Sequence, residues 1–127
     1  MSSSHPVRVF LADDSSVIRE RVNDLLAAAD MDVVGEAGTP RDCIERILVL
    51  RPDVVVLDVQ LEGGSGLQVL QAVRGIEPAV CFVVFSNNAV EAYRKRYLNA
   101  GAALFLDKSR EFARLAQAVG TVASRIH

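Results

Sequence analysis

The sequence lacks the features that mark membrane proteins and disulfide-stabilised secreted domains. It has no tryptophan and only two cysteines, Cys43 and Cys81, which stand without a CxxC pair or a histidine at metal-ligand spacing. We therefore expect both to be small apolar core residues rather than disulfide partners or metal ligands. The longest apolar runs, such as residues 54–57 and 80–85, have the length of strands and are far too short to span a membrane.

A strong charge bias is also missing. The net charge is −2 and charged residues make up 24% of the chain, which does not favour direct binding to nucleic acid. The first six residues, MSSSHP, contain neither the basic nor the apolar segment of a secretory signal. We expect one cytoplasmic domain over residues 1–127, with its core at about residues 7–125, because this length suits a single globular unit.

Apolar, β-branched runs alternate with segments of helical period, and this alternation repeats five times without a break in composition. Continuous apolar strands are typical of a parallel sheet that is covered by helices on both faces. The sequence thus predicts an α/β fold of three layers, (βα)5, with one five-stranded parallel sheet. The strands are expected at residues 7–12, 32–37, 54–57, 79–85 and 103–106.

Helix signals lie between these strands. Thr39 and Pro40 are typical of the cap and the first residue of a helix. The last helix is expected to run without interruption over about residues 110–125, because apolar residues recur there at helical spacing.

Residues with useful chemistry follow four of the five expected strands. Asp13 and Asp14 follow the first strand and Asp58 follows the third. Ser86 follows the fourth strand, and Lys108 comes just after the fifth. Ligands of open parallel sheets bind beyond the carboxyl ends of the strands. We therefore expect these side chains to share one cleft.

The residue types in this cleft suggest a metal and a phosphoryl group. Three converging carboxylates repel one another unless a cation is present. Oxygen ligands without histidine or cysteine favour Mg²⁺, with Mn²⁺ also acceptable. The ammonium of Lys108 and the hydroxyl of Ser86 suit two oxygens of a phosphoryl group beside the metal. Asp58 is then a candidate nucleophile that would form an aspartyl phosphate.

The acidic pair also allows a simpler interpretation. Asp13-Asp14-Ser15-Ser16 fits an ordinary helix start, in which side-chain oxygens accept hydrogen bonds from free amides. This stretch by itself favours the capping interpretation. The polar residues at the neighbouring strand ends favour the metal-binding interpretation instead.

Four segments together resemble one protein family. They are ADDS at residues 12–15, LDVQLEGGSGLQVL at 57–70, FVVF followed by Ser86, and AGAALFLDKS at 100–109. With these segments in this order, essentially the whole chain resembles the receiver domains of two-component response regulators. The resemblance implies a flavodoxin-like fold with strand order 2-1-3-4-5. It also implies transfer of a phosphoryl group to Asp58 from the phosphohistidine of a sensor histidine kinase or a histidine phosphotransfer protein.

The resemblance implies a metal-binding role for four residues. Asp14 and Asp58 would bind Mg²⁺ directly, and Asp13 would bind it through water. Gln60 would add its main-chain carbonyl oxygen as a further ligand.

The resemblance also implies a switch. Ser86 and Phe105 match the pair in which the hydroxyl moves toward the phosphoryl group and the aromatic ring turns inward. Lys108 would bridge the phosphoryl group and the carboxylate. The change would reach the face formed by the fourth helix, the fifth strand and the fifth helix. The expected partners include a downstream protein target or a missing output domain, and a homodimer remains open.

The sequence departs from the family pattern at three places. Lys108 is followed by Ser109, where many receivers have proline, so we expect a trans peptide bond and a Ser109 cap on the last helix. Glu62 stands where proline is frequent, and the following residues 63–66, GGSG, predict a mobile turn. Asn87 stands where many receivers have a smaller residue, and its bulk is expected to narrow access to Asp58.

Two other functions remain open at this stage. A phosphatase of the haloacid dehalogenase type also uses an aspartate nucleophile and Mg²⁺, but Gln60 replaces the second carboxylate of its DxD motif. A degenerate receiver could act as a constitutive binding domain. The complete set of acidic residues, hydroxyl and lysine argues against this function.

A stand-alone receiver and a piece of a longer regulator with an output domain fit the sequence equally. The basic run at residues 94–96 fits either a solvated helix face or a contact patch for a kinase or target.

Overall fold

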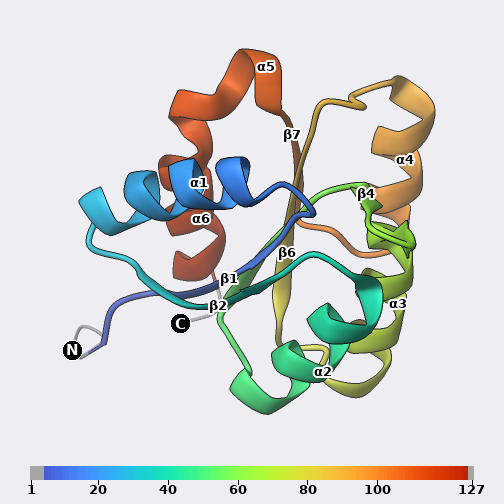
Figure 1. The fold of residues 1–127 in the computed structure, drawn as a ribbon, viewed down its shortest axis with the longest axis horizontal. Coiled ribbons are helices and arrows are strands. Elements are labelled where there is room, and N and C mark those ends of the chain that lie inside the picture. Colours follow the sequence, from blue (N-terminus) through green and yellow to red (C-terminus); the bar gives the residue numbers. More distant parts are fainter. Residues whose placement is uncertain (1–4, 126–127) are drawn as a thin grey trace.

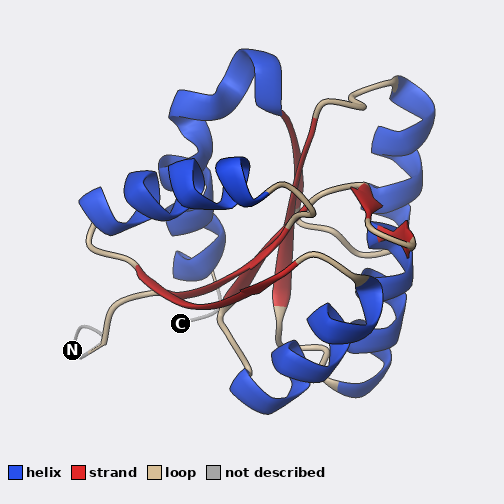
Figure 2. Cartoon of the chain, in the orientation of Figure 1, coloured by secondary structure: helices blue, strands red, loops and turns tan. Residues whose placement is uncertain are grey.

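The computed structural model describes residues 5–125, which form a parallel sheet between two layers of helices (Figures 1 and 2). Counting only the strands of this sheet, the spatial order is 2-1-3-4-5, so the predicted flavodoxin-like α/β fold is confirmed. The strands in that order are β2 (Asp32–Ala37), β1 (Arg8–Ala12), β3 (Val54–Leu57), β6 (Cys81–Ser86) and β7 (Leu104–Asp107).

The expected strands agree with the observed ones to within two residues at each end. The second and third match at both ends. The later two strands start and end further along the chain than expected, at residues 81–86 and 104–107. Ser86 is therefore the last residue of β6, paired with Asp107 of β7, rather than the first residue of a loop.

Helices cover both faces of the sheet (Figure 1). Val9 and Leu11 of β1 face a core that is completed by α1 and α6, whereas Phe10 and Ala12 face a core completed by α2, α3 and α4. The alternation arises because successive side chains of a strand point to opposite faces. The helices are α1 (Ser16–Ala28), α2 (Pro40–Leu50), α3 (Gly66–Ile76), α4 (Glu91–Asn99), α5 (Lys108–Glu111) and α6 (Leu115–Ser124).

Side-chain caps start the helices that follow the first two strands. The Ser15 hydroxyl accepts a hydrogen bond from the Ile18 amide at 3.2 Å and caps α1. Neither aspartate of the acidic pair is therefore the cap residue of α1. Thr39 caps α2 and Pro40 is its first residue, as predicted.

The expected single helix over residues 110–125 is wrong. The chain forms α5, a 3₁₀ turn (Phe112–Arg114) and then α6. The prediction that Ser109 is the cap is also wrong, because Asp107 takes this place: its carboxylate accepts hydrogen bonds from the Ser109 amide at 2.9 Å and from the Ser109 hydroxyl at 2.7 Å. The helix consequently begins at Lys108. Peptide bonds in the described residues are trans, so the prediction for Lys108–Ser109 is confirmed.

The segment after Asp58 forms a small hairpin that the sequence did not reveal. Strands β4 (Gln60–Leu61) and β5 (Gly64–Ser65) pair antiparallel, and Gly63 supplies the positive φ of +81° between them. Ser65 and Gln68 then form a reciprocal capping box at the start of α3. Residues 63–66, for which the sequence predicts a mobile turn, thus belong to this hairpin and to the start of α3.

The two cysteines are free thiols in different environments. Cys43 is fully buried, and this burial raises the pKa of its thiol to about 12. Cys81 is only half-buried, so the expectation of burial is met by Cys43 alone. None of the helices in residues 5–125 has the length and apolar character needed to cross a membrane.

Gly66 offers a test of how α3 packs against the end of β3. A Cβ at this position would overlap the carbonyl oxygen of Asp58, whereas a Cβ at Gly75, in the same helix, would meet nothing within 4 Å. We expect Gly66→Ala to lower the free energy of unfolding by about 1–3 kcal/mol. Gly75→Ala should raise it by about 0.5–1 kcal/mol through helix propensity. Urea unfolding of both variants checks this, and equal effects would contradict the close packing at Asp58.

Candidate functional site

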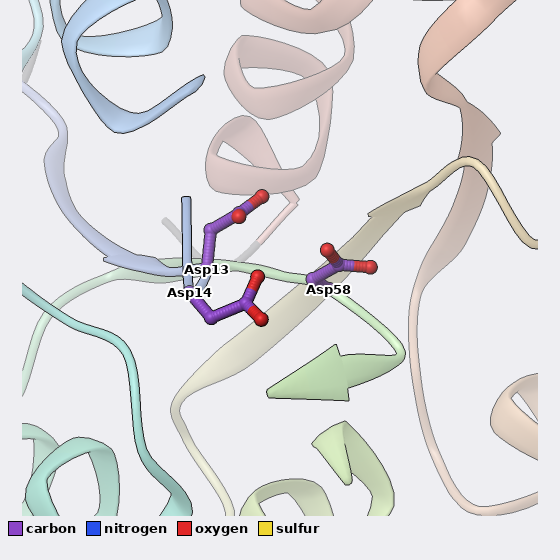
Figure 3. A group of neighbouring side chains, drawn as sticks. All are labelled: Asp13, Asp14 and Asp58. Atoms are coloured by element: carbon purple, nitrogen blue, oxygen red, sulfur yellow. The ribbon is translucent and has the colours of Figure 1, made fainter. Parts of the chain in front are cut away.

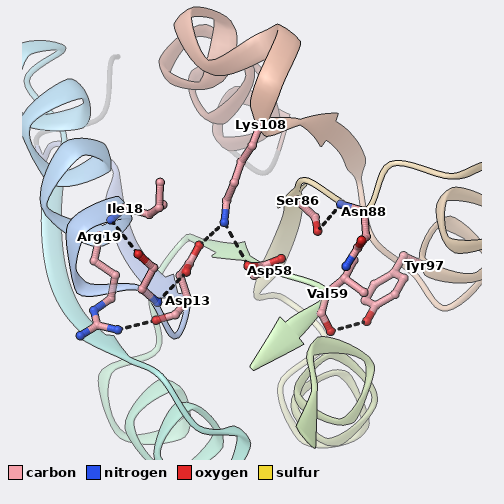
Figure 4. A network of polar contacts seen from close by, with 10 residues as sticks. Asp13, Ile18, Arg19, Asp58, Val59, Ser86, Asn88, Tyr97 and Lys108 are labelled. Atoms are coloured by element: carbon pink, nitrogen blue, oxygen red, sulfur yellow. Dashed lines mark hydrogen bonds and ion pairs between the residues drawn. The ribbon is translucent and has the colours of Figure 1, made fainter. Parts of the chain in front are cut away.

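The carboxyl ends of the strands bring the expected site residues together (Figures 3 and 4). Asp13 follows β1, Asp58 follows β3, and Lys108 follows β7. The sheet hydrogen-bonding pattern continues one residue beyond the strands. The Asp13 amide donates to the carbonyl oxygen of Ala37 at 3.1 Å, and the Asp58 amide donates to the carbonyl oxygen of Ala12 at 2.9 Å. These bonds hold both aspartates at the edge of the sheet.

Three carboxylates form a cluster at this edge. Oxygen atoms of Asp13, Asp14 and Asp58 lie within 4.8 Å of one another, and Figure 3 shows that the side chains surround a common space. Asp13 is buried, Asp58 is partly buried and Asp14 is exposed. The arrangement can hold a cation that is open to solvent on the Asp14 side.

Lys108 lies between two of these carboxylates. Its ammonium donates to Asp13 Oδ2 at 2.5 Å and to Asp58 Oδ2 at 3.0 Å, and the lysine side chain is only 6% exposed. Burial by itself would lower the pKa of Lys108, but the hydrogen bond to Asp13 and the charges of both aspartates outweigh it and raise the pKa above its usual value. The lysine is therefore positively charged at neutral pH.

The pKa of Asp13 is also raised, but here burial is the main cause. Burial raises the pKa of its carboxyl above the usual value, and the neighbouring charge of Asp58 adds to this effect. Hydrogen bonds from Lys108 and from the Ser15 amide partly offset it. One ammonium does not balance three carboxylates, so the cluster keeps an excess of negative charge that favours a further cation.

Arg19 of α1 holds the main chain at Asp13 in place, and this contact was not predicted from the sequence. Its guanidinium donates to the main-chain oxygen of Asp13 at 2.5 Å and to Glu36 of β2 at 2.7 Å. Figure 4 shows the first contact beside the Lys108 pair. No sequence signal singles out Arg19, because its partners are six and seventeen residues away and on other elements.

Ser86 and Phe105 lie on neighbouring strands but in different surroundings. Ser86 is 1% exposed, and its hydroxyl accepts a hydrogen bond from the Asn88 amide at 3.1 Å. Phe105 is 2% exposed, so its ring already points into the core. The ring meets Tyr97 of α4 edge-on, with centroids 6.1 Å apart, and the Arg94 guanidinium lies 5.5 Å from its centre.

The loop after Asp58 contains the remaining expected residue and a further contact. Gln60 begins β4, two residues beyond Asp58, and its side chain is exposed. The Tyr97 hydroxyl donates to the carbonyl oxygen of Val59 at 3.3 Å (Figure 4). Sequence reasoning missed Tyr97, because the sequence of a polar helix does not reveal which loop one of its aromatic side chains contacts.

Comparisons with known proteins match the fold. A family model described as the response regulator receiver domain matches residues 9–120. The DNA-binding transcriptional activator DevR/DosR of Mycobacterium tuberculosis is 39% identical over 118 residues, which cover 91% of this chain and 54% of that protein. The chemotaxis protein CheY of Thermotoga maritima is 28% identical over 115 residues, covering 91% of this chain and 96% of CheY.

A solved structure shows the same architecture. The signal receiver domain of NarL from Mycobacterium tuberculosis has a TM-score of 0.88 at 34% identity, and the match covers 94% of this chain and 98% of that one. The chain thus spans about half the length of DevR/DosR but nearly the whole of CheY and of the NarL receiver domain.

The repulsion between the three carboxylates can be tested by changing Asp14, the exposed residue of the cluster. We expect Asp14→Asn to raise the free energy of unfolding by about 0.5 kcal/mol in a buffer that contains a metal chelator, because it removes one of three mutually repelling charges. The effect is small because Asp14 is exposed and solvent screens its charge. Urea unfolding with EDTA measures the change. Asp24→Asn, at an exposed position of α1 outside the cluster, is the control. A loss of stability in Asp14→Asn, or an equal gain in both variants, would contradict the repulsion.

Proposed function

This chain belongs to the response regulator receiver domain family, and from that premise we propose that it is a phosphoryl-accepting signalling switch with Asp58 as the acceptor. The main support is the position of the Asp58 carboxylate: it is held by the Lys108 ammonium at 3.0 Å and lies beside two further carboxylates. Within residues 5–125, no other group of three or more acidic, histidine or cysteine side chains lies close enough together to hold a metal ion. The domain extends over residues 1–127 in this proposal, and the protein acts in the cytoplasm.

Mg²⁺ is the proposed metal, with Mn²⁺ as a possible substitute. The donor set fits, because it consists of carboxylate oxygens with an excess of negative charge and one side open to solvent. Asp14 and Asp58 would hold the ion directly, Asp13 through water, and Gln60 through its main-chain oxygen. When bound, the ion would offset the charge of the aspartates and of the incoming phosphoryl group.

The protein's own residues then have separate tasks in the transfer. An oxygen of Asp58 attacks phosphorus and forms the new O–P bond, while the P–N bond to the donor histidine breaks and its electron pair stays on the imidazole. Lys108 stays near Asp58 and pairs with an oxygen of the phosphoryl group. The partner is a sensor histidine kinase or a histidine phosphotransfer protein. The domain is accordingly a switch rather than a conventional enzyme.

The response begins at Ser86 in this proposal. A phosphoryl group adds about −1.5 to −2 charges and three acceptor oxygens, which only a group that moves toward it can use. The Ser86 hydroxyl, whose oxygen accepts a hydrogen bond from the Asn88 amide, would donate its own proton to an oxygen of the phosphoryl group. Phe105 is already buried, so the change would reach it by altering its contact with Tyr97 rather than by an inward turn from solvent. A downstream protein, an output domain or a second copy of the chain would read the result.

The acceptor assignment is tested by intact mass after incubation with acetyl phosphate. We expect a phosphoryl adduct on the parent protein when Mg²⁺ is present, because Asp58 then has its full set of partners. The adduct should be lost with EDTA and in Asp58→Asn. Asp53→Asn, with a carboxylate at the opposite end of β3, is the matched control that should keep the adduct.

The outcomes separate the candidate functions. An adduct on Asp58→Asn would overturn Asp58 as the acceptor. If the parent forms none, a phosphorylated histidine kinase is the next donor, and failure with that donor would favour a constitutive binding domain. Turnover of a small phosphate ester without a lasting adduct would favour the phosphatase, although Gln60 leaves that reaction without its second carboxylate.

Asn87 should control how fast the acceptor is reached. This exposed residue follows Ser86 directly, and its side chain is larger than the family often has there. We expect Asn87→Ala to gain or lose the phosphoryl group faster than the parent, as measured by the time course of the adduct mass. Asn99→Ala, at the last residue of α4, is the control. Unchanged or slower kinetics in Asn87→Ala would contradict the access argument.

A further inference from the structure

Helix α4 is attached to the rest of the protein at few points. Tyr97 is the one buried residue among its nine. The helix has no side-chain cap at its start, where Val90 precedes it, and most of its other side chains are exposed. In contrast, α3 buries four residues and begins with a capping box. The position of α4 therefore depends to an unusual degree on the contacts of Tyr97.

Those contacts reach the loop that follows the proposed acceptor. The Tyr97 hydroxyl donates to the Val59 carbonyl oxygen at 3.3 Å, and Val59 is itself 5% exposed (Figure 4). Burial of the Tyr97 side chain raises its pKa to about 12, so the hydroxyl is protonated and able to donate at neutral pH.

The ring of Tyr97 makes a different contact. It packs against Phe105 of β7 at 69° between the ring planes, inside the core shared by the sheet and α4. One side chain thus joins α4 to the acceptor loop through its hydroxyl and to β7 through its ring. The two contacts can be separated by experiment, because phenylalanine keeps the ring and removes the hydroxyl.

We propose that the Tyr97 hydroxyl is a positioning group that couples the metal and phosphoryl site to α4. The proposal rests on the function proposed above. Val59 lies between Asp58 and Gln60, two of the proposed metal ligands, so a bond to its carbonyl restrains the main chain that carries them. A change in that main chain when the site is loaded acts on the same bond, and through it on α4.

Thermodynamic linkage makes this coupling measurable from both ends. If the hydroxyl favours the loop conformation that binds Mg²⁺, its removal weakens Mg²⁺ binding. By the same linkage, loading the site changes how firmly α4 is held, and this effect is lost without the hydroxyl. A tyrosine that merely stabilises the fold would lower overall stability without changing either quantity.

The test compares Tyr97→Phe with Tyr93→Phe. The chain has only these two tyrosines; Tyr93 lies on the same helix but is 40% exposed, which makes its variant a matched control. Calorimetric titration gives the Mg²⁺ dissociation constant of each variant and of the parent. Hydrogen exchange gives the protection of the α4 amides, residues 91–99, without ligand and with Mg²⁺ plus beryllium trifluoride, a stable mimic of a phosphoryl group.

We expect Tyr97→Phe to bind Mg²⁺ roughly two- to tenfold more weakly than the parent, as the net loss of one hydrogen bond implies. It should also lose most of the ligand-dependent change in α4 exchange, while Tyr93→Phe behaves like the parent. If Tyr97→Phe retains parental Mg²⁺ affinity and the full exchange response, or if α4 of the parent does not respond at all, the coupling is overturned. A parent that binds no Mg²⁺ and forms no adduct overturns the proposed function, and the coupling with it.

Discussion

The buried ammonium of Lys108 between Asp13 and Asp58 is the contact on which the site depends. The lysine side chain is only 6% exposed, and its ammonium is costly to remove from water unless its charge is matched and its protons are hydrogen-bonded. The two carboxylates meet that need, and each in turn would repel the other if the lysine were absent. The three groups are therefore stable as a set. Because they lie up to 95 residues apart in sequence, their contact also joins the two halves of the fold.

The register of the parallel sheet determines which groups meet at this edge. Ala12 pairs with Leu57, so the residues that follow them, Asp13 and Asp58, leave the sheet together. Ser86 pairs with Asp107, and the next residue is Lys108. A slip of one residue in either pairing would turn these side chains toward the opposite face. The apolar strands thus do more than form a core, since their exact alignment brings the acid and base groups into hydrogen-bonding distance.

The elements that follow long apolar patterns could be predicted from the sequence, and so could the residues at their ends. Asp13, Asp58 and Lys108 were identified because a parallel sheet leaves its strand ends at one edge. The hairpin of residues 60–65 was missed, because strands of two residues show no periodicity. The interruption of the last helix was missed because its apolar spacing continues through the 3₁₀ turn. Contacts made by one long side chain across the fold, such as those of Arg19 and Tyr97, have no pattern in the sequence at all.

The two helices α3 and α4, which both contact the chain around the proposed acceptor Asp58, differ in how many buried residues hold them in place. On the α3 side, Gly66 packs against the Asp58 carbonyl so closely that no Cβ fits, and the helix is held by its capping box and four buried residues. On the α4 side, one buried tyrosine makes the main attachment. Segments with few buried contacts are the ones that move at low cost. A charge added at Asp58 would therefore shift α4 before α3, because the same disturbance meets a rigid packing surface on one side and a single hydrogen-bonded side chain on the other.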